Sequence, residues 1–239
     1  MWASIRIGAN GGFIGLTSRY TLGRAMKVAF GLKAHSGWAA LVVLGTRGRE
    51  LELVTRSRME LVEKDEAAWA KQPYHAAERL GQSDARDLVS RGLASARGIA
   101  AREMRAAAQR AHEAGHEIAG CAVLMGDPMP EWTVGEILAV HFRMHKAEGV
   151  MFRDALARAG EACGLKVLGI AEKQLDQHAE HLLATSITAL RKTIASLGKA
   201  AGPPWGKDQK DASLAAWIAL HGDGKTSWPL KKAGLMANG

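Results

Sequence analysis

The order of its apolar segments is the feature that most constrains what this chain can fold into. Strand-like runs rich in Val, Leu and Ala occupy residues 27–32 and 38–44, and a third, Arg-rich run covers 51–62. Only short turns separate the three. Consecutive strands with short connections pair antiparallel, so the sequence predicts a three-stranded antiparallel unit at the start of the fold.

After this unit the pattern alternates between helix and strand. Pro73 and Gly81 interrupt the first helical region, and Gly115 stands where a C-cap glycine ends it. A buried strand that follows a helix in this way indicates a parallel crossover. The remaining expected elements are helix 66–114, strand 116–125, helix 133–162, strand 165–170 and helices 175–197 and 208–221. This βββαβαβα order is typical of the ribonuclease H-like fold, an α/β fold with a mixed five-stranded sheet and helices on both faces.

The chain divides into one domain with two flanking segments. Residues 1–25 contain five glycines and no acidic residue, and we expect a flexible N-terminal extension. Met26, directly before the first strand, is an alternative translation start. We expect the ribonuclease H-like domain over 26–222 and a basic tail over 223–239.

Composition narrows the function classes. The chain is 47% hydrophobic, enough for a sizeable core, and no apolar run approaches the roughly 18 residues of a membrane span. Two cysteines are too few for a disulfide scaffold, which favours a reducing, cytoplasmic location. A net charge of +8 favours an anionic partner such as nucleic acid, although removing the three arginines of residues 1–25 lowers it to +5.

Three segments resemble RuvC-type Holliday-junction resolvases. Residues 207–220, KDQKDASLAAWIAL, are similar to the last helix of that family, and Asp208 and Asp211 match its paired aspartates. Residues 141–175 and 31–39 are similar to its helix–strand–helix segment and first hairpin. The resemblance implies an endonuclease acting on structured DNA or RNA with Mg²⁺ or Mn²⁺, and a homodimer.

The departures from the family pattern concern its metal ligands. The family uses a first-strand aspartate, a glutamate at the end of the fourth strand and the two late aspartates. Here Lys33 occupies the first-strand position, and Asp127 is the nearest carboxylate to the end of strand 116–125. The candidate catalytic residues are therefore Asp208, Asp211, Asp127 and Lys33, and the three aspartates are the candidate metal ligands.

Lys33 leaves three interpretations open, because a protonated lysine cannot coordinate a cation. It can pair with the aspartates as the remnant of a lost metal site, serve a metal-free binding protein by contacting a phosphate, or belong to a rearranged nuclease site. The first two interpretations make the domain non-catalytic.

Residues that could contact nucleic acid lie outside this carboxylate set. Four arginines cluster on the second hairpin, where they form either a solvated strand face or a phosphate-contacting edge. Two tryptophans beside Pro- or Gly-rich loops either stack on bases or pack under the loops. These residues are Arg47, Arg49, Arg56, Arg58, Trp132 and Trp205.

Two other classes of protein remain as alternatives. His112, Glu113 and His116 match the H-E-x-x-H motif of zinc peptidases, which needs both histidines on one helix. Since Gly115 is expected to end the helix, His116 should lie beyond it. The other alternative is a purely structural or interaction protein. Two further histidine pairs at helical spacing, His141 with His145 and His178 with His181, are either metal ligands or ordinary surface residues.

Overall fold

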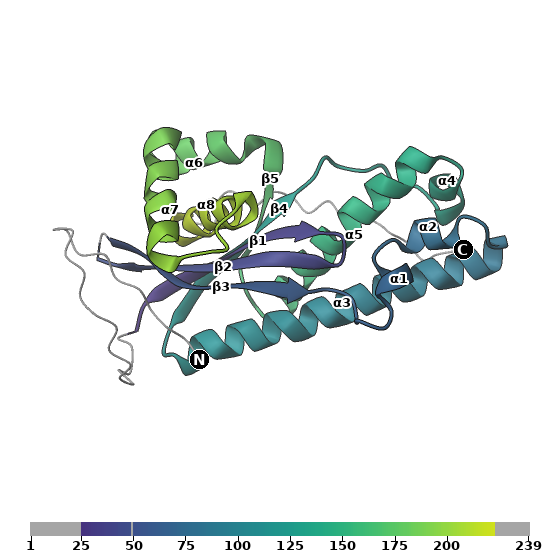
Figure 1. The fold of residues 1–239 in the computed structure, drawn as a ribbon, viewed down its shortest axis with the longest axis horizontal. Coiled ribbons are helices and arrows are strands. Elements are labelled where there is room, and N and C mark those ends of the chain that lie inside the picture. The colour runs from purple at the N-terminus through teal and green to yellow at the C-terminus, as the bar shows by residue number, and fades with distance from the viewer. Residues whose placement is uncertain (1–24, 49, 223–239) are drawn as a thin grey trace.

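The structure is a computed structural model in which residues 25–48 and 50–222 are described. The expected extension, apart from Ala25, the expected tail and Arg49 lie outside the described residues. Two short helices and one long helix follow the first three strands. A strand, two helices and a second strand come next, and the described part of the chain ends in further helices (Figure 1). In order, the elements are β1 (Lys27–His35), β2 (Trp38–Arg47), β3 (Glu50–Glu60), α1 (Ala67–Ala70), α2 (Pro73–Ala77), α3 (Gln82–Glu113), β4 (Glu117–Met125), α4 (Val134–Leu138), α5 (His141–Ala162), β5 (Val167–Ala171), the 3-10 helix η1 (Glu172–Gln174), α6 (Leu175–Leu183), α7 (Ile187–Ala201) and α8 (Lys207–His221).

The five strands form one mixed sheet in the order β3-β2-β1-β4-β5. β1 pairs antiparallel with β2, and β2 pairs antiparallel with β3. β4 pairs parallel with β1 and with β5. This arrangement confirms the predicted α/β class and the mixed five-stranded sheet with helices on both faces.

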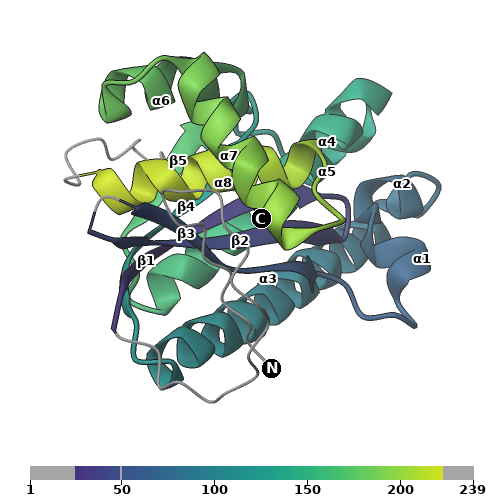
Figure 2. The same ribbon diagram turned by 60° about the vertical axis from the view of Figure 1, so that its left-hand side comes forward.

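Alternation along β1 assigns its side chains to two hydrophobic cores. Val28, Phe30 and Leu32 belong to the core under α3 and α5, whereas Ala29 belongs to the core under α7 and α8. Figure 2 shows α3 on one side of the sheet and α6, α7 and α8 on the other. By the same alternation, Lys33 lies on the face that α8 covers.

Gly31 lets α8 lie directly on the sheet. A Cβ atom at this position would come within 1.9 Å of the Ala212 carbonyl oxygen and 2.7 Å of the Ala216 nitrogen. Only a residue without a side chain permits this close approach. The contact places the first turn of α8 beside the end of β1.

Two predicted helices are each divided in the structure. The helix expected over 133–162 is α4, with a Thr133 capping box, followed by α5 after a break at Val140, whose φ and ψ of −140° and 112° are extended. The helix expected over 175–197 is divided at Ala184, which has a φ of +47°, and Ser186 caps the new helix α7. Apolar residues keep their helical spacing across both breaks. The sequence pattern alone therefore predicted one continuous helix in each case.

Among the described residues, none of the helices is long and apolar enough to cross a membrane.

Candidate functional site

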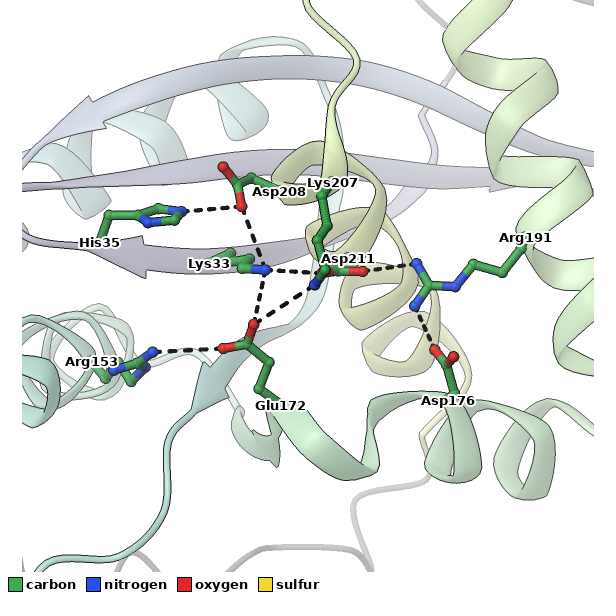
Figure 3. A network of polar contacts seen from close by, with 9 residues as sticks. All are labelled: Lys33, His35, Arg153, Glu172, Asp176, Arg191, Lys207, Asp208 and Asp211. Carbon is green, nitrogen blue, oxygen red and sulfur yellow. Dashed lines mark hydrogen bonds and ion pairs between the residues drawn. The ribbon is translucent and has the colours of Figure 1, made fainter.

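Lys33 lies at the centre of a charged network at the carboxyl end of β1 (Figure 3). Its Nζ atom is 2.9 Å from Glu172 Oε1 and 2.9 Å from Asp211 Oδ2. It is also 3.4 Å from Asp208 Oδ1. The Lys33 side chain is only 7% exposed, so its ammonium group is held among three carboxylates and largely away from water.

Secondary structure explains why these carboxylates converge. Asp208 and Asp211 are three residues apart in the first turns of α8 and therefore face the same side of that helix. Glu172 directly follows β5, whose carboxyl end lies at the same sheet edge as that of β1 because the connecting pairs are parallel. The site therefore forms where ligands commonly bind in open α/β sheets.

Further cations surround the carboxylates. Lys207 Nζ is 2.6 Å from Asp211 Oδ2, and Arg191 Nη1 donates to Asp211 Oδ1 at 2.8 Å. Arg153 of α5 lies 3.6 Å from Glu172 Oε2, and His35 Nε2 lies 3.1 Å from Asp208 Oδ1. Arg191 also pairs with Asp176. The network balances the cations Lys33, Arg153, Arg191 and Lys207 against the carboxylates Glu172, Asp176, Asp208 and Asp211.

Both central groups are held in their charged forms. Burial alone would raise the pKa of Asp211, but hydrogen bonds from Lys207, Arg191 and Lys33 outweigh it and lower the pKa to about 2. Burial likewise acts to lower the pKa of Lys33, but the hydrogen bonds to Glu172 and Asp211 raise it above its ordinary value. Lys33 is therefore an ammonium ion throughout the physiological pH range.

The residues present do not fit a pair of divalent ions. A two-metal nuclease site needs carboxylate oxygens free to face ions about 3.5–4 Å apart. Here the ammonium of Lys33 occupies the space between Glu172, Asp208 and Asp211 and contacts one oxygen atom of each. It also supplies the positive charge that a cation would have provided.

Of the three predicted carboxylates, two lie beside Lys33 and one does not. Asp208 and Asp211 lie together with Lys33, but Asp127 is an exposed residue that pairs with Lys173 at 2.7 Å. The hydrogen bond from Lys173 lowers the pKa of Asp127. Glu172 holds the third position beside Lys33, and the sequence analysis missed it. Its place directly after a buried strand was the signal available.

The predicted arginine cluster is not one surface. Arg47 lies on the α3 side of the sheet, where it pairs with Glu52 at 2.7 Å and contacts Met26. Arg56 lies on the opposite side and donates to the carbonyls of Ala201 and Pro203. Arg47 and Arg56 thus have partners within the fold, and Arg49 lies outside the described residues.

Arg58 and the tryptophans form cation–π pairs. Arg58 lies 4.0 Å from the ring centroid of Trp38, and this half-buried ring also stacks on His35, with the two ring centroids 4.4 Å apart. Trp132 lies under Arg143. Trp205 is covered by Arg56 and packs against Gly198. Trp132 and Trp205 are both half-buried.

The zinc-peptidase motif does not have its required geometry. α3 ends at Glu113, and Gly115 has a φ of +78°, so His112 is helical while His116 is not. The Gly115 amide donates to the His112 carbonyl, which closes the helix end. The two histidines therefore do not project from one continuous helix, and this alternative was wrong on structural grounds.

A cavity of about 450 Å³ opens beside the charged network. Four of its lining side chains are basic and three are acidic. Its lining comprises Glu172, Lys173, Leu175, Asp176, Arg191, Lys207, Lys210 and Asp211.

The chain is similar to solved structures at low sequence identity. No protein-family model and no curated protein sequence matches the chain. Among solved structures, Thermus thermophilus RuvC is 10% identical with a TM-score of 0.45, and covers 80% of this chain and 91% of its own. T. thermophilus RuvC in complex with a Holliday junction substrate is 12% identical with a TM-score of 0.44 and the same coverage.

Proposed function

We propose that this domain binds the phosphate backbone of structured nucleic acid without cleaving it. The observation that carries the proposal is the Lys33 ammonium group, which lies within 3.4 Å of an oxygen atom of each of three carboxylates. An ammonium group in this position supplies the positive charge that metal ions would have supplied. Without bound metal, the site also loses metal activation of a water molecule.

The charge of the chain supports a polyanionic partner. The sequence carries a net charge of +8, and the cavity beside the network is lined by Lys173, Arg191, Lys207 and Lys210. Lys173 and Lys207 are 79% and 76% exposed, so they can reach a phosphate beyond their present partners. Sequence-independent phosphate contacts of this kind dominate the affinity of most nucleic-acid-binding proteins.

Of the arginines on the second hairpin, Arg58 is the one we include in the binding surface. Its guanidinium group pairs with Glu60, but both side chains are more than half exposed, and Arg58 lies on the same side of the sheet as the cavity. Arg47 and Arg56 are assigned to holding the fold, since their guanidinium groups bond to Glu52 and to backbone carbonyls.

Cleavage and metal binding test the non-catalytic part of the proposal. We expect no cleavage of a labelled four-way DNA junction, DNA duplex or RNA duplex with Mg²⁺ or Mn²⁺, and no Mn²⁺ binding by calorimetry at the network. Lys33→Asp should gain Mn²⁺ binding, because it adds a carboxylate where the ammonium stood. Metal-dependent cleavage by the wild type that Asp211→Asn abolishes would overturn the proposal.

Salt dependence tests the binding part. Lys207→Gln combined with Lys210→Gln should weaken binding to the junction and flatten the dependence of log Kd on log salt by roughly two counterions. The matched control is Lys27→Gln with Lys166→Gln, which removes two exposed lysines at the opposite edge of the sheet. If the two double variants bind the junction with the same affinity and the same salt dependence, the surface that carries Lys207 and Lys210 is not the contact surface. No salt-sensitive binding by the wild type would favour a purely structural or interaction protein.

The proposal also includes the association of two copies of the chain as a homodimer. Leu80, Val140 and Phe142 are the large hydrophobic side chains exposed among the described residues. Light scattering of the full chain across a concentration series measures whether two copies associate.

A further inference from the structure

Three of the nine histidines meet on the side of the molecule that α3 and α5 cover. His141 and His145 lie one turn apart at the start of α5, and His75 comes from α2, which packs beside it (Figure 1). The ring centroids are 5.0 Å apart for His75 and His141, 4.5 Å for His75 and His145, and 4.7 Å for His141 and His145. One nitrogen from each ring lies within 4.8 Å of the other two.

A buried carboxylate holds His75 in place. Glu148, only 3% exposed, accepts a hydrogen bond from His75 Nδ1 at 2.8 Å. Its other oxygen accepts the backbone N–H groups of Tyr74 and His75, both at 3.1 Å. Glu148 therefore caps the first turn of α2 and fixes the orientation of the imidazole ring on it.

This hydrogen bond determines which nitrogen of His75 is free. An ionised carboxylate can only accept, so Nδ1 donates and the neutral ring carries its lone pair on Nε2. That Nε2 atom is buried and has no hydrogen-bond partner among the described residues. A buried lone pair without a partner is costly, and a carboxylate on the opposite ring nitrogen is the usual support of a metal-binding histidine.

The spacing of the other two rings fits a metal ion. His141 Nε2 and His145 Nε2 are 3.1 Å apart. Two nitrogens bound to one tetrahedral Zn²⁺ at 2.0–2.1 Å are about 3.3 Å apart. Histidines four residues apart on a helix provide this pair of ligands on one face.

We propose that His75, His141 and His145 bind a Zn²⁺ ion through their Nε2 atoms, with Glu148 as the supporting carboxylate. Three imidazole ligands select a late transition metal over Mg²⁺ or Ca²⁺, which prefer oxygen. His141 and His145 are exposed, so a water molecule can take the fourth position. The ion joins α2 to α5 and is separate from the Lys33 network, which lies on the other face of the sheet.

Zinc titration of the full chain tests the site. The protein is prepared without a polyhistidine tag and stripped with a chelator, and ZnCl₂ is added in a calorimeter. We expect one ion per chain with a Kd in the micromolar range or tighter, and an absorption band in the visible when Co²⁺ is used instead. Bound zinc should also raise the Tm.

Variants separate this site from incidental binding. His141→Ala with His145→Ala should weaken zinc binding at least 100-fold, and Glu148→Gln should weaken it 10- to 100-fold. His178→Ala with His181→Ala removes the same number of histidines from α6 and should leave the Kd unchanged. Because His141 and His145 are exposed, their loss should not unfold the protein, which circular dichroism checks. Wild-type binding weaker than millimolar, or equal loss in both double variants, would overturn the proposal.

Discussion

Lys33 and Lys207 show how the surroundings of a charge set its contribution to stability. Both contact Asp211 Oδ2, at 2.9 and 2.6 Å, but the side chain of Lys33 is 7% exposed and that of Lys207 is 76% exposed. The shorter contact belongs to the solvated lysine. Because water screens exposed ion pairs and loss of a buried partner leaves charges uncompensated, the longer contact should matter more.

This comparison predicts the effect of removing each lysine. Lys33→Met should lower the free energy of unfolding by about 3 kcal/mol, since it leaves buried carboxylates without their central cation. Lys207→Met should lower it by less than about 1 kcal/mol. Urea denaturation of the two variants measures both values. Equal losses would mean that the network is open to solvent around Lys33.

Gly31 determines how closely helix α8 can approach the sheet. The missing Cβ at this position is what admits the backbone of α8 at Ala212 and Ala216. α8 carries Asp208 and Asp211, so the position of the whole site depends on this contact between a strand and a helix.

Replacing this glycine tests the contact. Gly31→Ala should destabilise the protein by about 2–3 kcal/mol or more, because the new methyl group overlaps backbone atoms of α8. Gly98→Ala is the matched control, since Gly98 is exposed in α3 and an added Cβ would meet nothing within 4 Å. The control should stabilise by about 0.5–1 kcal/mol through helix propensity. Thermal unfolding compares them, and similar Tm values would contradict close packing of α8.

The charged network joins β1, α7 and α8 on one face of the sheet. Asp211 receives hydrogen bonds from Lys33 of β1, Arg191 of α7 and Lys207 of α8. Its ionisation is therefore linked to the assembly of the sheet with two helices, and it should appear in the global stability of the domain.

The sign of this pH dependence follows from the lowered pKa. Asp211 has a pKa of about 2 in the folded protein against an ordinary 3.8. Its contribution, about 2 kcal/mol, is complete above about pH 4 and is lost as the pH falls toward 2. Unfolding free energies from pH 6 to 2 should fall more steeply for the wild type than for Asp211→Asn. Carbon NMR titration of the Asp211 carboxyl group measures its pKa directly, and an ordinary value would refute the linkage.

Local sequence determined the elements of this protein. Period-two and helical apolar patterns, together with Gly115 and Pro73, depend on neighbouring residues and therefore predict strands, helices and several of their ends. The same locality explains the pairing of Asp208 and Asp211 on one helix face. Breaks such as Ala184 were missed because apolar spacing continues across them.

Only the tertiary structure decided which distant side chains meet. Glu172 rather than Asp127 completes the set around Lys33, because β5 and β1 end at one edge of the sheet. His75 joins two histidines far along the chain through the packing of α2 on α5. Such contacts depend on strand order and helix packing, and these are set by burial of the whole core and not by any short segment.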